Sequence, residues 1–229
     1  MQPASKAVSA RRLGFSRLGL ALALPLTLAA WVKTDDNTKA LNILQIRTAF
    51  TDLFRLRTSI AGKVVAQTGQ ASVFVTATSS ATLANNTWTH VAAVFATASS
   101  RIVYVAGVNS GSDSNSSTPS GVNTTDIGSG SDTGATFQVA WPAIWTAALS
   151  AGEVAALAAG LDPRLLQSQR AALSDFWPLI GASPEPDAIA AARNFTVTGA
   201  TRSDDPGNLI YATGRTRQVP PGNRYVGAA

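Results

Sequence analysis

The sequence predicts an all-β protein: an antiparallel β-sandwich with one or two short helices and extended termini. Apolar and polar residues alternate in many short segments, which indicates strands with one buried face. Gly, Asn, Asp and Ser separate these segments at short intervals, as in sandwiches and barrels. Only 14% of the 229 residues are charged, and two are glutamate. A long helical coiled coil, which needs many Glu and Lys residues, is therefore excluded.

The first expected strand spans residues 20–33. Leucine occupies every second position of the run from Leu18 to Leu28. A secretory signal is the alternative, because basic residues precede this apolar run. The period of two is a strand pattern, however, and the run is too short to cross a bilayer as a helix. We therefore expect a strand that remains part of the protein.

Six further strands are expected after a turn at residues 35–37. Their apolar positions alternate, and residues such as Gly69, Asn85 and Asn86 mark turns between them. Arg55 and Arg57 share one face of the second segment and make that face basic. The six segments are 41–48, 52–60, 63–67, 71–78, 87–95 and 101–106.

Residues 109–134 are rich in Ser, Gly, Asp and Asn and contain few apolar residues. This composition predicts exposed loops around one short strand near 122–127. The strand pattern returns at 137–145.

A short helix is expected after Ser150. Ser150 is a favourable N-cap residue, and Glu153 completes a capping box three positions later. Gly160 ends this helix. The remaining elements are expected at 163–172 (helix), 174–180 and 193–200 (strands). The whole chain divides into a basic arm (1–17), a sandwich domain (18–200) and an extended tail rich in Pro, Gly and Arg (201–229).

The residue counts exclude several kinds of chemistry. The chain has no cysteine, so disulfides, thiolate zinc sites and cysteine nucleophiles are excluded. Its single histidine, His90, excludes a site with two imidazoles from one chain. We expect His90 to pack in a strand beside Trp88. The sequence has neither a carboxylate-rich strand nor a glycine-rich phosphate loop with its lysine.

Two adjacent segments resemble the laminin G-like, concanavalin A-like family. Residues 88–95 (WTHVAAVF) resemble its Trp-x-His-Val strand, and residues 101–107 (RIVYVAG) resemble the Tyr-x-Asn-Gly hairpin that follows. Ala106 stands where the hairpin asparagine is usual. Residues 26–33 resemble the opening strand, and 144–154 the closing strand and short helix. The resemblance covers residues 18–200 and implies a concanavalin A-like jelly roll.

The resemblance says less about function than about fold. The catalytic branch of the family carries a Glu-x-Asp-x-x-Glu strand that this sequence lacks, so a non-enzymatic member is implied. Some members bind calcium through Asp and Asn of rim loops. The loop residues that could do so are Asp113, Asn115, Asp126 and Asp132. Their spacing does not match a calcium loop, so we expect no metal and no cofactor.

Single-domain proteins of tailed bacteriophages share the Ser150-x-x-Glu153 element and residues 175–179 (DFWPL). The first hypothesis is therefore a structural protein of a phage virion, a capsid decoration or tail component present in many copies. Residues 1–34 and 206–229 are basic and contain no acid. These ends would dock on acidic capsid or tail subunits, and no membrane span is expected. The expected docking residues are Arg11, Arg12, Arg17, Arg215, Arg217 and Arg224.

The alternative is a carbohydrate-binding module for host-surface or extracellular glycans, on a virion or secreted. It rests on analogy with the lectin branch of the family. Tryptophan rings can stack on sugars, but four of the five are expected in the core, with Trp141 the exception. Arg55 and Arg57 could face an acidic partner or form an ordinary polar face. The expected glycan-binding residues are Trp141, Asp113, Asn115, Asn123 and Asp126.

Overall fold

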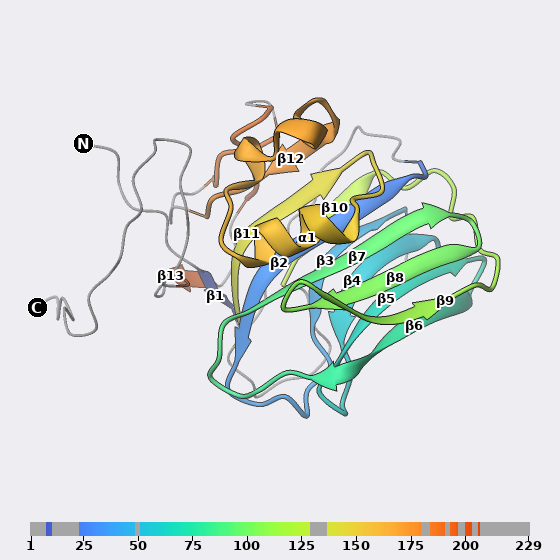
Figure 1. Cartoon of the computed structure of the whole chain (residues 1–229), viewed down its shortest axis with the longest axis horizontal. Coiled ribbons are helices and arrows are strands. Elements are labelled where there is room, and N and C mark those ends of the chain that lie inside the picture. The colour runs from blue at the N-terminus through green and yellow to red at the C-terminus, as the bar shows by residue number, and fades with distance from the viewer. Residues whose placement is uncertain are drawn as a thin grey trace, which may run out of the picture.

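The structure is a computed structural model that describes residues 8–10, 23–48, 51–128, 137–179, 184–190, 193–196, 200–202 and 206. It confirms the antiparallel β-sandwich (Figure 1). Two sheets lie one over the other, and the helical segments lie on the side of the larger sheet. Within these residues, no helix is both long and apolar enough to cross a membrane.

The larger sheet, called sheet A, contains eight of the described strands. Its order is β13-β1-β11-β2-β7-β8-β9, and β12 pairs with β11 outside this path. The bounds are β1 (Val8–Ala10), β2 (Leu26–Thr34), β7 (Thr89–Thr97), β8 (Ser100–Val105), β9 (Val108–Asp113), β11 (Phe137–Trp145), β12 (Leu173–Phe176) and β13 (Ala200–Arg202).

The smaller sheet, called sheet B, contains five strands in the described part of the chain, in the order β10-β3-β4-β5-β6. Every neighbouring pair is antiparallel. The bounds are β3 (Asn42–Arg47), β4 (Leu53–Thr58), β5 (Lys63–Gln70), β6 (Val73–Thr82) and β10 (Thr124–Ile127).

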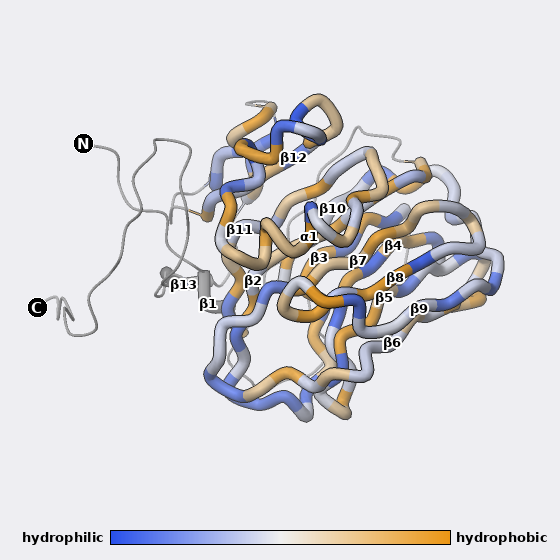
Figure 2. Tube along the Cα trace, in the orientation of Figure 1, coloured by the Kyte–Doolittle hydropathy of each residue, from blue (hydrophilic) through white to orange (hydrophobic). Residues whose placement is uncertain are grey.

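The main core lies between the two sheets. Leu26 and Leu28 of β2 are buried in it, as the leucine alternation predicts. From sheet B, Phe54 points toward sheet A and makes an edge-to-face contact with Phe95 of β7, with ring centroids 5.3 Å apart. Figure 2 shows hydrophobic residues recurring along the strands of both sheets. Because side chains alternate along a strand, the neighbours of Phe54 in β4 point to the opposite face of sheet B.

A second apolar layer covers the outer face of sheet A. Helix α1 (Ala151–Ala158) places Val154 and Leu157 on this face, where they meet Trp145 and Phe176. Two short 3-10 segments, η1 (Pro163–Leu165) and η2 (Gln167–Ala172), follow α1. The central strands of sheet A are therefore buried on both sides, whereas the described helices pack on sheet A and not on sheet B.

The edges of the two sheets meet at β6 and β9. The hydroxyl of Ser110 accepts a hydrogen bond from the backbone N–H of Ala81, with 3.0 Å between the two atoms. Gly111 lies so close to the carbonyl oxygen of Thr78 that a Cβ atom there would overlap it. The composition of residues 109–134 predicts a loop at this part of β9, and that expectation is wrong. Strand β9 pairs with β8 through backbone hydrogen bonds. Because such bonds do not require apolar side chains, a polar segment can form this strand.

Other boundaries also differ from the expected ones, and the strand expected at 174–180 is the shorter β12 (Leu173–Phe176). Strand β2 begins at Leu26, and residues 11–22 lie outside the described residues. The helix expected at 163–172 is two 3-10 segments with a kink at Gln169. In the segment expected as the strand 193–200, the described residues 193–196 form a single bridge, between Phe195 and Glu185, and Ala200 begins β13.

Candidate functional site

The candidate site is the outer face of sheet B, where polar side chains form a row across all five strands. The register places Asp126 opposite Gln45, Gln45 opposite Arg55, Arg55 opposite Gln67, and Gln67 opposite Thr76. All five lie on the face away from the core, because their neighbours along each strand are in it. Four gaps between strands give the row a length of about 19 Å.

One end of the row is a fixed hydrogen-bonded cluster. Asp126 is 4% exposed, and its Oδ2 accepts hydrogen bonds from Arg47 Nε (2.5 Å) and Gln45 Nε2 (2.8 Å). Arg47 also forms an ion pair with this carboxylate. The charge of Asp126 is therefore directed at Arg47, and the buried Gln45 holds the carboxylate in place.

The centre of the row carries positive charge. Arg55 and Arg57 are half-buried side chains of β4. Burial, together with the nearby charges of Arg57 and Arg47, lowers the pKa of Arg55 to about 10, whereas Asp126 acts in the opposite direction. The three guanidinium groups of Arg47, Arg55 and Arg57 and the carboxylate of Asp126 together carry a net charge of +2.

The other end of the row is apolar and accessible. Phe74 of β6 is 47% exposed and lies over Gly69 of β5, where a Cβ atom would come within 2.7 Å of the ring. The absence of a side chain at Gly69 therefore lets the ring lie against the sheet. Thr76 and Thr78 are exposed on the same strand and the same face. An aromatic surface thus borders hydroxyl groups and an arginine.

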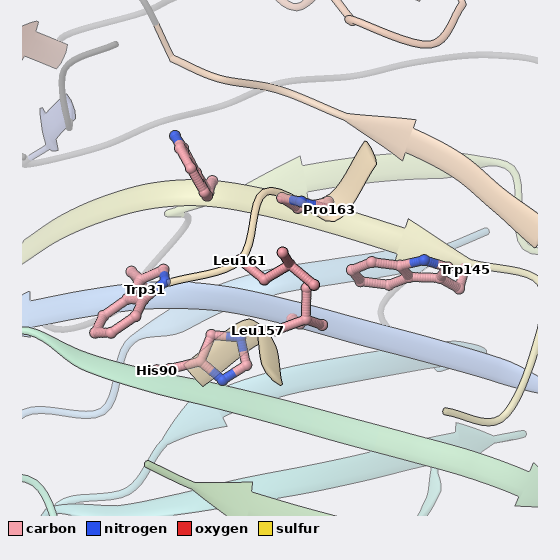
Figure 3. Close-up of a pocket in the computed structure, with 8 residues that line it drawn as sticks. Trp31, His90, Trp145, Leu157, Leu161 and Pro163 are labelled. Atoms are coloured by element: carbon pink, nitrogen blue, oxygen red, sulfur yellow. The ribbon is translucent and has the colours of Figure 1, made fainter. Parts of the chain in front are cut away.

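A hollow under α1 is a weaker candidate. It has a volume of about 10 Å³ and is lined by Trp31, His90, Trp145 and Leu157 among others (Figure 3). This is the size of one water molecule, so a sugar ring does not fit. Burial lowers the pKa of His90 to about 3, so the imidazole is neutral near pH 7. His90 packs edge-on against Trp31, with centroids 5.6 Å apart.

A comparison with protein families identifies the fold family. A model described as the concanavalin A-like lectin/glucanases superfamily matches residues 15–155. The chain belongs to this superfamily. A search of the curated proteins finds no match.

Solved structures of concanavalin A-like type share the architecture at low sequence identity. The native heptameric SAP-like pentraxin from Limulus polyphemus has a TM-score of 0.54 and 14% identity, over 89% of this chain and 91% of that one. Domain 4 of AbnA, a GH43 extracellular arabinanase from Geobacillus stearothermophilus in complex with arabinotriose, has a TM-score of 0.52 and 20% identity, over 62% and 70%. A structure of HCR/D has a TM-score of 0.56 and 11% identity over 69% of this chain, which spans 43% of that protein. These identities show a shared fold alone.

The concanavalin A-like sandwich separates the residues that the sequence analysis grouped as glycan-binding. Asp126 belongs to the row on sheet B, and Asn123 precedes the same strand and donates its N–H to the carbonyl of Arg47. Asp113 and Asn115 lie with β9, beyond the opposite edge of sheet B. There Asp113 pairs with the buried Arg101 and accepts a hydrogen bond from Asn115 Nδ2 (2.8 Å). Two separate clusters therefore replace the single expected site.

Trp141 does not offer a surface for stacking. It is 3% exposed and packs edge-on against Phe176 under α1, with centroids 5.8 Å apart. A φ of 51° at the bulge between Ala140 and Ala143 directs it there. Trp145 and Trp177 are fully buried as expected, whereas Trp31 and Trp88 are half-buried. The Nζ of Lys33 lies 5.8 Å from the centre of the Trp88 ring.

The expected docking arginines (Arg11, Arg12, Arg17, Arg215, Arg217 and Arg224) all lie outside the described residues, as does Asp132. Within the described part of the chain, no three His, Asp or Glu side chains are grouped as a metal site would require. Phe74, Gln45, Gln67 and Thr76 were missed by sequence reasoning. The basic face at Arg55 and Arg57 was the one signal that pointed to this surface.

Proposed function

We propose that this chain is a carbohydrate-binding domain that takes a saccharide on the outer face of sheet B. The observation that carries this proposal is the polar row that ends at the exposed ring of Phe74. Saccharides present hydroxyl groups at their edges and apolar C–H surfaces on their ring faces. Arg55 and Thr76, with the 8% exposed Gln67 between them, supply donors and acceptors for the first, and Phe74 supplies a flat apolar surface for the second.

On this proposal, the domain binds a saccharide and does not cleave it. The carboxylate of Glu153 is occupied in the helix cap and accepts a hydrogen bond from Ser168. Glu185 is fully buried, and His90 is buried and neutral. A glycosidase of the common type requires two carboxyl groups on either side of one bond. Asp126 is the sole carboxylate in the polar row, and it is paired with Arg47.

A glycan array followed by calorimetry tests the proposal. Phe74→Ala removes the aromatic surface and should lower the affinity for a bound saccharide about tenfold, or ~1.4 kcal/mol. Val108→Ala is the matched control, because Val108 is 67% exposed and lies on β9 of sheet A. If Phe74→Ala and Val108→Ala bind as tightly as the parent, the ligand is not bound on sheet B. An array without any hits would contradict saccharide binding itself.

We infer a virion role as a second candidate from the charge of the two ends. Residues 1–34 and 206–229 contain basic residues and no acid. Such ends are suited to acidic neighbours in a phage capsid or tail, and a domain anchored in this way could also present sheet B to host glycans. Deletion of residues 1–12 or 212–229 should then reduce the amount of this protein in purified particles. Unchanged incorporation of both variants would refute docking through the ends.

A further inference from the structure

The guanidinium of Arg55, at the centre of the polar row, has an incomplete set of partners. Its Nε is buried and has no hydrogen-bond acceptor among the described residues. Its Nη1 lies 3.4 Å from Asn42 Oδ1, which is a long distance for a hydrogen bond. A buried donor without an acceptor is costly. The chain itself therefore leaves Arg55 with unused capacity to bind an acceptor.

The neighbouring charges differ from Arg55 because each already has a partner. Arg47 is paired with Asp126, at 2.5 Å. Arg57 donates from its Nε to the carbonyl oxygen of Thr58, at 3.0 Å. Asp126, the one acid that favours the charged form of Arg55, is held at the far side of Gln45 by two other hydrogen bonds. The excess positive charge on this face is thus concentrated at Arg55 and Arg57.

We propose that the outer face of sheet B selects saccharides that carry a carboxylate, and that Arg55 binds this carboxylate. This inference rests on the proposed function and names its ligand class. A uronic acid combines the features that the face matches: an anion for Arg55, hydroxyl groups for Gln67 and Thr76, and a ring face for Phe74. A carboxylate also matches the planar, two-pronged donor geometry of a guanidinium.

The position of Arg55 favours a sugar acid over a simple ion. Arg55 lies directly opposite Gln67, which lies opposite Thr76, so three polar side chains follow one line across β4, β5 and β6. Phe74 lies two register pairs along β6 from this line. A ligand that reaches from Arg55 to Phe74 must cross about two strand gaps, or ~10 Å. An oligosaccharide has this extent, whereas an isolated anion contacts Arg55 alone.

The test compares oligogalacturonate with its methyl ester, which has the same sugars without the charge. Calorimetry on the full chain should show at least tenfold tighter binding of the acid form. Arg55→Gln should remove this preference and lower the affinity for the acid at least tenfold. Arg55→Lys, which keeps the charge but loses the planar fork, should give an intermediate affinity. Arg170→Gln is the matched control, since Arg170 is exposed in η2 on the side of sheet A.

The outcomes separate this inference from the proposed function. Equal affinity for the acid and its ester, with both weakened by Phe74→Ala, would overturn carboxylate selection and leave saccharide binding intact. Array hits restricted to neutral glycans would also overturn carboxylate selection and leave saccharide binding intact. A sulfated oligosaccharide or a single-stranded nucleic acid that binds more tightly than the uronate would overturn the carboxylate assignment. Failure of every saccharide to bind would refute both proposals.

Discussion

At the scale of single residues, buried acids determine how stability responds to pH. Asp187 is 5% exposed, and its Oδ1 accepts hydrogen bonds from the backbone N–H groups of Phe176 and Ile189. Its Oδ2 is buried without a hydrogen-bond partner in the described structure. Burial, together with the nearby charge of Asp175, raises the pKa of Asp187 to about 6.

The raised pKa of Asp187 predicts the effect of Asp187→Asn. In the parent protein, the protonated carboxyl contributes stability that is fully present below pH 3.8 and is lost as the pH rises through 6. The variant does not titrate, so its stability relative to the parent should increase by on the order of 1 kcal/mol between pH 5 and pH 8. Urea unfolding at both pH values measures this difference.

The same comparison cancels the contribution of His90, which has the opposite sign. Because the pKa of His90 is lowered to about 3, its contribution to stability is lost as the pH falls below 6.5. This loss is present in both proteins and disappears from their difference. A difference in stability that stays constant from pH 5 to pH 8 would mean that Asp187 does not titrate in this range.

At the scale of elements, α1 depends on its capping box. The backbone N–H of Ser150 donates to Glu153 Oε2 (2.7 Å), and the N–H of Glu153 donates to Ser150 Oγ (3.3 Å). Ser150→Ala should lower the free energy of unfolding by about 1 kcal/mol. Gly152→Ala is the matched control of opposite sign, because no atom lies within 4 Å of the added methyl group. It should stabilise the helix by about 0.5–1 kcal/mol, and thermal melts of both variants check the pair.

The contact between β6 and β9 predicts a second glycine effect. Gly111 has no room for a side chain, because the carbonyl oxygen of Thr78 occupies the place of its Cβ. Gly111→Ala should therefore separate the two sheet edges and cost about 1–3 kcal/mol. Denaturant unfolding measures this cost against the parent. If Gly111→Ala does not lower the free energy of unfolding, the two edges are not in close contact.

At the scale of the whole molecule, the fold is predictable from sequence because its signals are local. The leucine alternation before Thr34 predicts the inward face of β2, and the Ser150–Glu153 spacing predicts the start of α1. Strand β9 is missed because its side chains are polar, and its pairing with β8 depends on backbone hydrogen bonds. The segment 163–172 was expected as one helix. It forms instead the two 3-10 segments η1 and η2, which pack beside β12.

The candidate site is only partly predictable, because it is made by register between strands that are distant in sequence. Arg55 and Arg57 are visible as a basic face of one strand, whereas Gln45, Gln67 and Asp126 join them only after the sheet has formed. Trp141 illustrates the opposite failure. It was the one tryptophan not expected in the core, yet a bulge in β11 turns the ring under α1. Pairing across a sheet cannot be derived from the spacing of residues along one chain segment.

The central claim is that saccharides bind on the outer face of sheet B. Its most direct test is an NMR titration in which amide resonances are followed while an oligogalacturonate is added. The largest shifts are predicted on β4, β5 and β6, at Arg55, Gln67 and Thr76, and Phe74→Ala should reduce them. Largest shifts at the half-buried Trp31 and Trp88, or at Asp113 on β9, would contradict the claim.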